Sequence, residues 1–148
     1  MYNALSVARY IIDYCNEQGM GVSNLKLQKI LYFVQAEFLV STPNSRPCFR
    51  DKIEAWDFGP VVPNVYHQYK IFGSASIPPR INERLTPYLE EILPADQLKI
   101  NAIVDETSRY SASQLVAITH HQTPWMSAYR RGFNNEITNE SILEFFRG

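Results

Sequence analysis

The sequence predicts a mainly α-helical fold: a compact single domain of five to six helices with an irregular middle and room for one short β-hairpin. Eight of its nine prolines lie between Pro43 and Pro94, which leaves residues 1–42 and 95–123 free of proline. Because a proline inside a helix costs about 3 kcal/mol, the long helices belong in these two windows. In both windows apolar residues recur at helical spacing. A chain of 148 residues is of the size of one domain, so we assign residues 1–148 to one.

Two helices are expected in the first window, separated by Gly19 and Gly21. The first spans about residues 3–18. The second begins after Ser23, a residue type that caps helix N-termini. Its apolar residues recur at i, i+3, i+4, i+7 and i+11 and form a stripe that must be buried: Leu27, Ile30, Leu31, Val34 and Phe38.

The middle of the chain is less regular. Residues 52–58 alternate weakly between apolar and polar, which indicates a short strand or hairpin. The Gly-Pro-Val-Val-Pro stretch at 59–63 then opens a short helix that ends at Gly73, because proline suits the first turn of a helix and glycine its end. Residues 74–94 are expected to form a proline-rich connection with at most one helical turn.

The second half of the sequence is helical again. Asp96 is placed to cap a helix whose buried face consists of Ile100, Ile103, Val104 and Thr107. Ser111 and Gln114 have the spacing of a capping box at the start of the next helix. Thr138 is the expected N-cap of the final helix, with apolar residues on either side of it in staple positions.

Composition argues against several classes of function. Fourteen Lys and Arg against fifteen Asp and Glu give a net charge of −1, whereas a nucleic-acid-binding domain usually carries a basic stripe. Two cysteines without CxxC spacing make neither a disulfide framework nor a metal site. No nucleotide, dinucleotide or zinc-protease motif is present, so we expect no cofactor. No apolar window reaches the ~18 residues of a membrane span, so a soluble cytoplasmic protein is expected.

Two sets of residues suggest catalysis only weakly. His120 and His121 are adjacent, and adjacent side chains on a helix point about 100° apart, which suits a single metal ion poorly. We expect one of them to cap the last turn of its helix and the other to lie on the surface. Cys48 could pair with His67 or His120, but its polar, proline-flanked loop lacks the positive surroundings of a reactive thiolate. We therefore assign no catalytic or metal-binding residue and expect a protein that is not an enzyme.

Several aromatic residues lie in or beside the irregular segments, where periodicity does not assign them to the core: Trp56, Phe58, Tyr66, Tyr69 and Trp125. Aromatic side chains are enriched at protein–protein interfaces and dominate their binding energy. An alternative is that the rings fill the core where loops cannot. A third is a base-stacking surface, which normally needs a basic groove that this composition does not supply.

Three stretches carry a family resemblance: KLQKILYF at 26–33, AWDFGPVVPNVYHQYKIFG at 55–73 and THHQTPW at 119–125. Any amphipathic helix could contain a stretch like the first one. The occurrence of all three stretches in this order is much more specific for one family. Together they resemble the Panacea domain, the SocA-like antitoxin family that includes phage-associated GepA-like proteins, over essentially the whole chain. The motif residues, expected to be mainly structural, are Lys26, Leu27, Gln28, Lys29, Leu31, Tyr32, Trp56, Gly59, Pro60, Val61, His120 and Pro124.

The resemblance implies a non-enzymatic antitoxin of a two-gene module, which neutralises the toxin encoded by a neighbouring gene through protein–protein binding. For at least one branch it implies an adaptor that delivers the toxin to a cytoplasmic AAA+ protease, although the motifs name no residue of this sequence for that role. Residues around the 59–63 turn and in the last motif are the first candidates for partner binding: Asp57, Tyr66, His67, Lys70 and Trp125.

Two other classes of function stay open. One is a phage or prophage protein that binds a host factor. The other is a histidine-dependent enzyme or a nucleic-acid-binding domain that uses His120, His121 and a face formed by Lys26 and Lys29, both of which lie off the apolar stripe of their helix.

Overall fold

The computed structural model of the chain describes residues 1–79 and 89–148. The helical turn expected within residues 74–94 is absent from 74–79 and 89–93, and the rest of that connection lies outside the described residues. None of the helices in the two described ranges has the run of apolar residues that a bilayer crossing requires.

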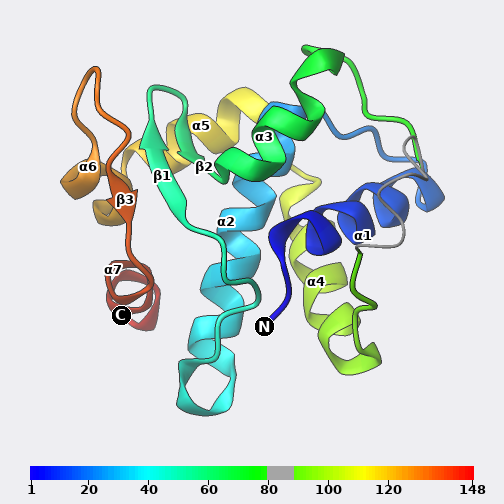
Figure 1. Ribbon diagram of the computed structural model, residues 1–148, viewed down its shortest axis with the longest axis horizontal. Helices are drawn as coiled ribbons and strands as arrows, with labels where there is room; N and C mark the ends of the chain where they lie inside the picture. Colours follow the sequence, from blue (N-terminus) through cyan, green and yellow to red (C-terminus); the bar gives the residue numbers. More distant parts are fainter. Residues whose placement is uncertain (80–88) are drawn as a thin grey trace.

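The predicted mainly α-helical class is confirmed, and the described residues form seven α-helices and a small antiparallel sheet (Figure 1). The helices are α1 (Ala4–Glu17), α2 (Asn24–Ser41), α3 (Pro63–Tyr69), α4 (Pro94–Thr107), α5 (Ala112–His120), α6 (Thr123–Ala128) and α7 (Asn139–Arg147). The strands are β1 (Ile53–Trp56), β2 (Gly59–Val61) and β3 (Glu136–Ile137). Short 3-10 turns follow α2 and α3, at Pro43–Ser45 and Lys70–Phe72. Helix α6 was not expected from the sequence.

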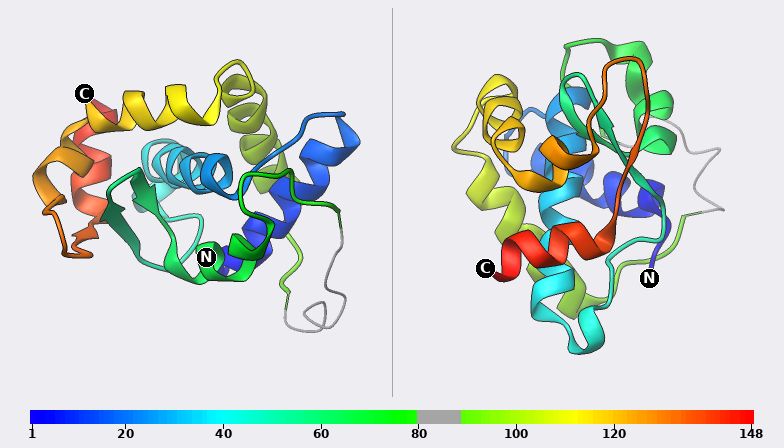
Figure 2. Two further views of the ribbon diagram at one scale, coloured as in Figure 1. Left: turned by 90° about the horizontal axis from the view of Figure 1, so that it is seen from above. Right: turned by 90° about the vertical axis from the view of Figure 1, so that its left-hand side faces the viewer.

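Helix α2 is the centre of the structure. Five helices and strand β2 pack against it, and in the views of Figures 1 and 2 they surround it on most sides. Every residue of the predicted apolar stripe is buried, and so are polar residues that lie off it: Asn24, Gln28, Lys29 and Gln35. A helix that is covered nearly all round has no solvent face, so its polar side chains need partners within the protein.

The middle of the chain forms the hairpin that the sequence suggested. Strands β1 and β2 pair antiparallel with Trp56 opposite Gly59, and β3 pairs with the other edge of β1. The prediction that the short helix opens at residue 59 is wrong, because Gly59 and Pro60 belong to β2 and α3 begins at Pro63. Val62 is extended, as a residue before proline prefers to be, and this separates the strand from the helix.

The predicted cap of α4 is also wrong. The helix begins at Pro94 with Leu93 at the N-cap position, because proline is pre-set for the first helical residue. Asp96 lies instead in the first turn, buried, where it accepts hydrogen bonds from the Tyr2 hydroxyl at 2.6 Å and from Arg46 Nη2 at 3.0 Å. The other predicted caps are confirmed: Ser23, the capping box of Ser111 and Gln114, and Thr138.

Replacing Leu31 by alanine tests the central position of α2. Its side chain is fully buried, so Leu31→Ala should lower the free energy of unfolding by about 2–5 kcal/mol. Leu98→Ala is the control: Leu98 is 71% exposed on α4, and its loss should change stability by less than about 0.5 kcal/mol. Urea unfolding followed by circular dichroism measures both, and equal small losses would contradict the central packing of α2.

Candidate protein-binding surface at the hairpin

Buried polar side chains of α2 hold the hairpin in place. Gln28 Oε1 accepts a hydrogen bond from the backbone N–H of Val62 at 2.9 Å, while Gln28 Nε2 donates to Asn24 Oδ1 at 2.9 Å. One residue further on, Lys29 Nζ donates to the Pro60 carbonyl oxygen at 3.1 Å. The first sequence motif therefore contacts the backbone of the second one directly.

Lys29 is fully buried, which is not what its position off the apolar stripe predicted. Burial lowers the pKa of its amine to about 7. Gly59 of β2 and Thr119 of α5 lie close to the end of the Lys29 side chain. A Cβ added at Gly59 would lie 2.7 Å from Lys29 Cε and 2.9 Å from Thr119 Oγ1. Gly59 also has a φ of +104°, a conformation that side chains rarely adopt. Because Lys29 is inside, the basic Lys26/Lys29 face assumed for nucleic-acid binding does not exist.

The other motif residues are also placed in or against the core. Tyr32, which is buried, donates from its hydroxyl to Gln122 Oε1 at 2.7 Å and so joins α2 to the turn before α6. Burial raises the pKa of the Tyr32 phenol. The remaining buried members are Leu27, Gln28, Leu31, Gly59, Pro60, Val61 and Pro124, and the half-buried ones are Lys26, Trp56 and His120. This placement suits the structural role expected of them.

Trp125 lies in a stack of three rings beside the hairpin. Its indole is 4.0 Å from the His120 ring on one side and 4.5 Å from the Tyr129 ring on the other, measured between ring centroids. Trp125 Nε1 donates to the Trp56 carbonyl oxygen at 2.8 Å, and the Tyr129 hydroxyl donates to Asp57 Oδ1 at 2.5 Å. Hydrogen bonding to the Asp57 carboxylate raises the pKa of the Tyr129 phenol. The third motif is thus bonded to the second through the unexpected helix α6.

A second aromatic group lies on the α3 side of the hairpin. The Trp56 and Tyr66 rings meet edge to face at 5.0 Å, and Tyr66 and His67 do the same at 5.5 Å. Lys70 Nζ lies 3.3 Å from His67 Nδ1. The candidates for partner binding therefore form two groups around Trp56, with Tyr66, His67 and Lys70 on one side and Asp57 and Trp125 on the other.

A groove of about 370 Å³ lies beside the hairpin turn, between α3, the start of α2 and the loop at 132–134. Trp56, Asp57 and Tyr66 line it, whereas His67, Lys70 and Trp125 do not. Two phenylalanines in its wall stay largely in water: Phe58 is 65% exposed and Phe133 is 62% exposed. We refer to this recess and its two phenylalanines as the hairpin groove.

Phe133 was not among the candidates expected from the sequence. Its segment has no periodicity, and β3 was not expected. The hydrogen bond from the Ala55 N–H to the Asn135 carbonyl oxygen, 2.8 Å long, brings this loop alongside β1. The one local signal was a phenylalanine directly after a glycine, Gly132, whose φ of +83° marks a tight turn.

The residues weighed for catalysis are placed unfavourably for it. Cys48, expected in a polar loop, is fully buried, because its segment pairs with the backbone at Tyr2. Burial raises the pKa of its thiol, which disfavours the reactive thiolate. His121 Nδ1 lies 2.8 Å from the Ala117 carbonyl oxygen, as expected of a residue at a helix end. His120 is half-buried in the ring stack and not on the surface as predicted. No group of three or more potential metal-binding side chains occurs within residues 1–79 and 89–148.

The fold and this surface define a small helical domain that presents aromatic side chains around a hairpin whose backbone is hydrogen-bonded to α2 and α6. The sequence matches the family described as antitoxin SocA-like, Panacea domain, over residues 27–126. It is 38% identical over 130 residues to Antitoxin SocA of Caulobacter vibrioides (strain NA1000 / CB15N), an alignment that covers 83% of this chain and 68% of that protein. The chain therefore belongs to the SocA-like antitoxin family, which confirms the resemblance seen in its motifs. No solved structure is a significant match.

Gly59→Ala and Gly132→Ala together test the contact between the hairpin and Lys29. Both glycines have positive φ, but a Cβ at Gly132 meets nothing within 4 Å. Gly132→Ala should therefore cost only the backbone strain, about 1–2 kcal/mol. Gly59→Ala adds overpacking against Lys29 and Thr119 and should cost at least about 1 kcal/mol more. Urea unfolding measures the difference, and equal losses would show that the hairpin does not press on the buried amine.

The stability of the protein should depend on pH through Lys29. Its pKa is lowered from 10.5 to about 7, so above pH 7 the unfolded chain holds a proton that the folded chain lacks. The free energy of unfolding should then rise with pH, by up to about 1.4 kcal/mol per pH unit. The cysteine thiols, whose pKa values are raised from 9.0, oppose this rise only at higher pH.

Urea unfolding of the wild type between about pH 7 and 8.5 should therefore show a gain of about 1–2 kcal/mol. Lys29→Met should remove this dependence, whatever its effect on stability at one pH. Lys26→Met, a change of the half-buried lysine on the same helix, should keep it. A slope that survives Lys29→Met would show that the amine is not the titrating group.

Proposed function

We propose that this antitoxin-family chain neutralises a toxin protein by binding it directly at the hairpin groove, without catalysing a reaction. The toxin is then the product of a neighbouring gene, as in the two-gene modules that the family resemblance implies. The observation that supports this site is the pair of phenylalanines, Phe58 and Phe133, which stay 65% and 62% exposed in the wall of one groove. Exposed apolar side chains that gather at a recess mark interaction sites.

The hairpin groove has the properties of an interface centre. Aromatic residues that fill a pocket on the partner typically contribute most of the binding energy, surrounded by polar residues that contribute little. A standard interface buries about 800 Å² on each partner, so the groove needs contributions from the neighbouring surfaces of α3 and α6. Asp57, His67 and Lys70 are exposed there, and the charges of Asp57 and Lys70 select between partners.

The hydrogen bonds that hold the hairpin also favour this surface as a binding site. Gln28 and Lys29 bind the backbone of the hairpin from below, and Trp125 binds the Trp56 carbonyl oxygen from the side. A loop that is already ordered before binding loses little conformational entropy in the complex. Occupying the surface of a toxin needs no acid, base or nucleophile, which agrees with the burial of Cys48.

Truncation of the two phenylalanines tests this site. The double variant Phe58→Ala/Phe133→Ala should fold with the wild-type stability, because both side chains are exposed. It should weaken binding of the purified neighbouring gene product at least about 30-fold, the equivalent of one interface hot spot of about 2 kcal/mol. Calorimetric titration measures the affinity, and growth on co-expression measures protection from the toxin.

Leu93→Ala/Leu98→Ala is the matched control, since these residues of α4 and its cap are 63% and 71% exposed. It should leave binding and protection unchanged. If the control pair weakens binding and the phenylalanine pair does not, the interface lies on the α4 side. If the toxin disappears from cells only when an AAA+ protease is active, the chain delivers the toxin for degradation. If the purified chain alone cleaves or modifies the toxin, a purely binding role is contradicted.

A further inference from the structure

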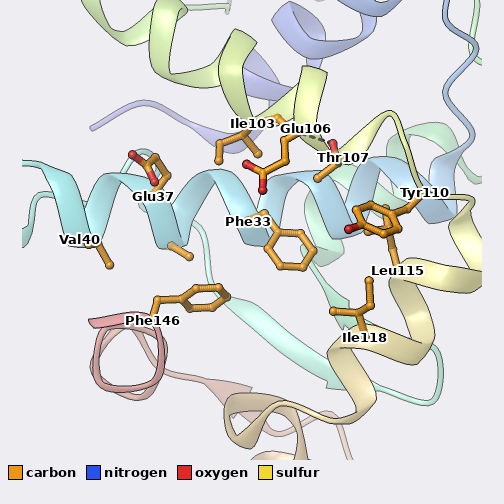
Figure 3. A pocket seen from close by; sticks show the side chains of 11 residues that line it. Phe33, Glu37, Val40, Ile103, Glu106, Thr107, Tyr110, Leu115, Ile118 and Phe146 are labelled. Carbon is orange, nitrogen blue, oxygen red and sulfur yellow. Dashed lines mark hydrogen bonds between the residues drawn. The ribbon is translucent and has the colours of Figure 1, made fainter. Parts of the chain in front are cut away.

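A second groove, of about 330 Å³, lies on another side of α2 and shares no lining residue with the hairpin groove. Helices α2, α4, α5 and α7 form its walls (Figure 3). Its apolar lining includes Phe33 of α2, Ile118 of α5 and Phe146 of α7, which face one another across the recess in Figure 3. Val40, at one end of the α2 wall, is 45% exposed. We refer to this recess as the α2–α4 groove.

The α2–α4 groove has the length of about two helical turns. Its α2 wall consists of Phe33, Ala36, Glu37 and Val40, at positions i, i+3, i+4 and i+7. At 1.5 Å per residue this wall is about 10 Å long. A partner helix that presents apolar residues at the same spacing fits a groove of this length, as in other complexes where a helix lies in an apolar groove.

Two carboxylates lie among the mainly apolar side chains of the lining, Glu37 from α2 and Glu106 from α4 (Figure 3). Within the described part of the chain, the three ion pairs are formed by other residues. Neither the Glu37 carboxylate nor the Glu106 carboxylate forms a hydrogen bond there. Among residues 1–79 and 89–148, no lysine or arginine lines the groove. A partner that enters it meets a mainly apolar surface with two carboxylates that have no cationic partner in the described part of the chain.

From this arrangement we propose that the α2–α4 groove binds an amphipathic α-helix of a partner protein, apolar on one face and with lysine or arginine beside that face. The apolar residues of that helix enter the recess beside Phe33 and Phe146. Its cations pair with Glu37 and Glu106, which selects against acidic or neutral helices. Because the two grooves share no residue, this partner can bind while a toxin occupies the hairpin groove.

A designed peptide of about 14 residues is the probe, with leucines at i, i+3, i+4 and i+7 and lysines beside them. Its fluorescence anisotropy should show saturable binding to the full chain. A second peptide, in which every lysine is replaced by glutamate, should bind at least tenfold more weakly. Binding of the lysine peptide should also weaken with added salt, because ion pairs at a groove rim are screened.

Charge reversal of the protein completes the test. Glu37→Lys/Glu106→Lys should exchange the preference, so that the glutamate peptide binds the variant more tightly than the lysine peptide does. Glu17→Lys/Glu91→Lys makes the same change of charge at exposed positions outside the groove and should leave the preference unchanged. Phe58→Ala/Phe133→Ala should also leave it unchanged, which separates this proposal from the toxin site. Circular dichroism confirms that each variant folds.

Three results would overturn the proposal. The first is equal affinity for the two peptides, which would mean apolar adhesion without charge selection. The second is an exchange of preference that follows the Glu17 and Glu91 variant as well, which would mean that net charge alone decides. The third is a dimer of the chain in sedimentation experiments that the lysine peptide dissociates, which would assign the groove to a second copy of this protein.

Discussion

The buried amine of Lys29 is the constraint on which the hairpin depends. Taking a lysine out of water is costly, and here the Pro60 carbonyl oxygen is the acceptor that compensates it. The amine also fixes its neighbours, since only a glycine at position 59 leaves room for Lys29 Cε. Removing one partner of such a contact costs more than the contact itself contributes, because the other is left buried and unsatisfied. The position of the β1–β2 turn follows from this pair.

Other polar residues of α2 act in the same way along its length. Gln35 Oε1 accepts from the backbone N–H groups of Cys48 and Phe49, at 2.9 and 3.1 Å, and so orders the loop after α2. Tyr32 reaches Gln122 before α6. The central helix therefore serves two purposes: its apolar stripe forms the core, and its buried polar side chains position the loops that pass over it. Loops held in this way present their own side chains to a partner without further ordering.

The two grooves differ in physical character. The hairpin groove carries side chains that project into water, Phe58 and Phe133, and it suits a partner with a pocket to fill. The α2–α4 groove is a recess with negative charge and suits a partner that projects into it. The two proposed sites would allow a toxin and a second protein to be bound at once, and binding at one would strengthen binding at the other only where the two partners are themselves linked.

The sequence by itself determined the helices other than α6, three of their caps and the buried stripe of α2, because periodicity and capping depend on residues a few positions apart. Of the partner-binding candidates taken from the sequence, Asp57 and Tyr66 line the hairpin groove, whereas His67, Lys70 and Trp125 do not. Only the tertiary structure decided the burial of Lys29 and the position of Phe133. The acceptor of Lys29 lies 31 residues away, and Phe133 reaches the groove because its loop pairs with β1. Contacts between segments so far apart in the sequence leave no periodic pattern. Local patterns therefore identify the helices and strands, but they do not show which polar side chains become buried when these elements pack together.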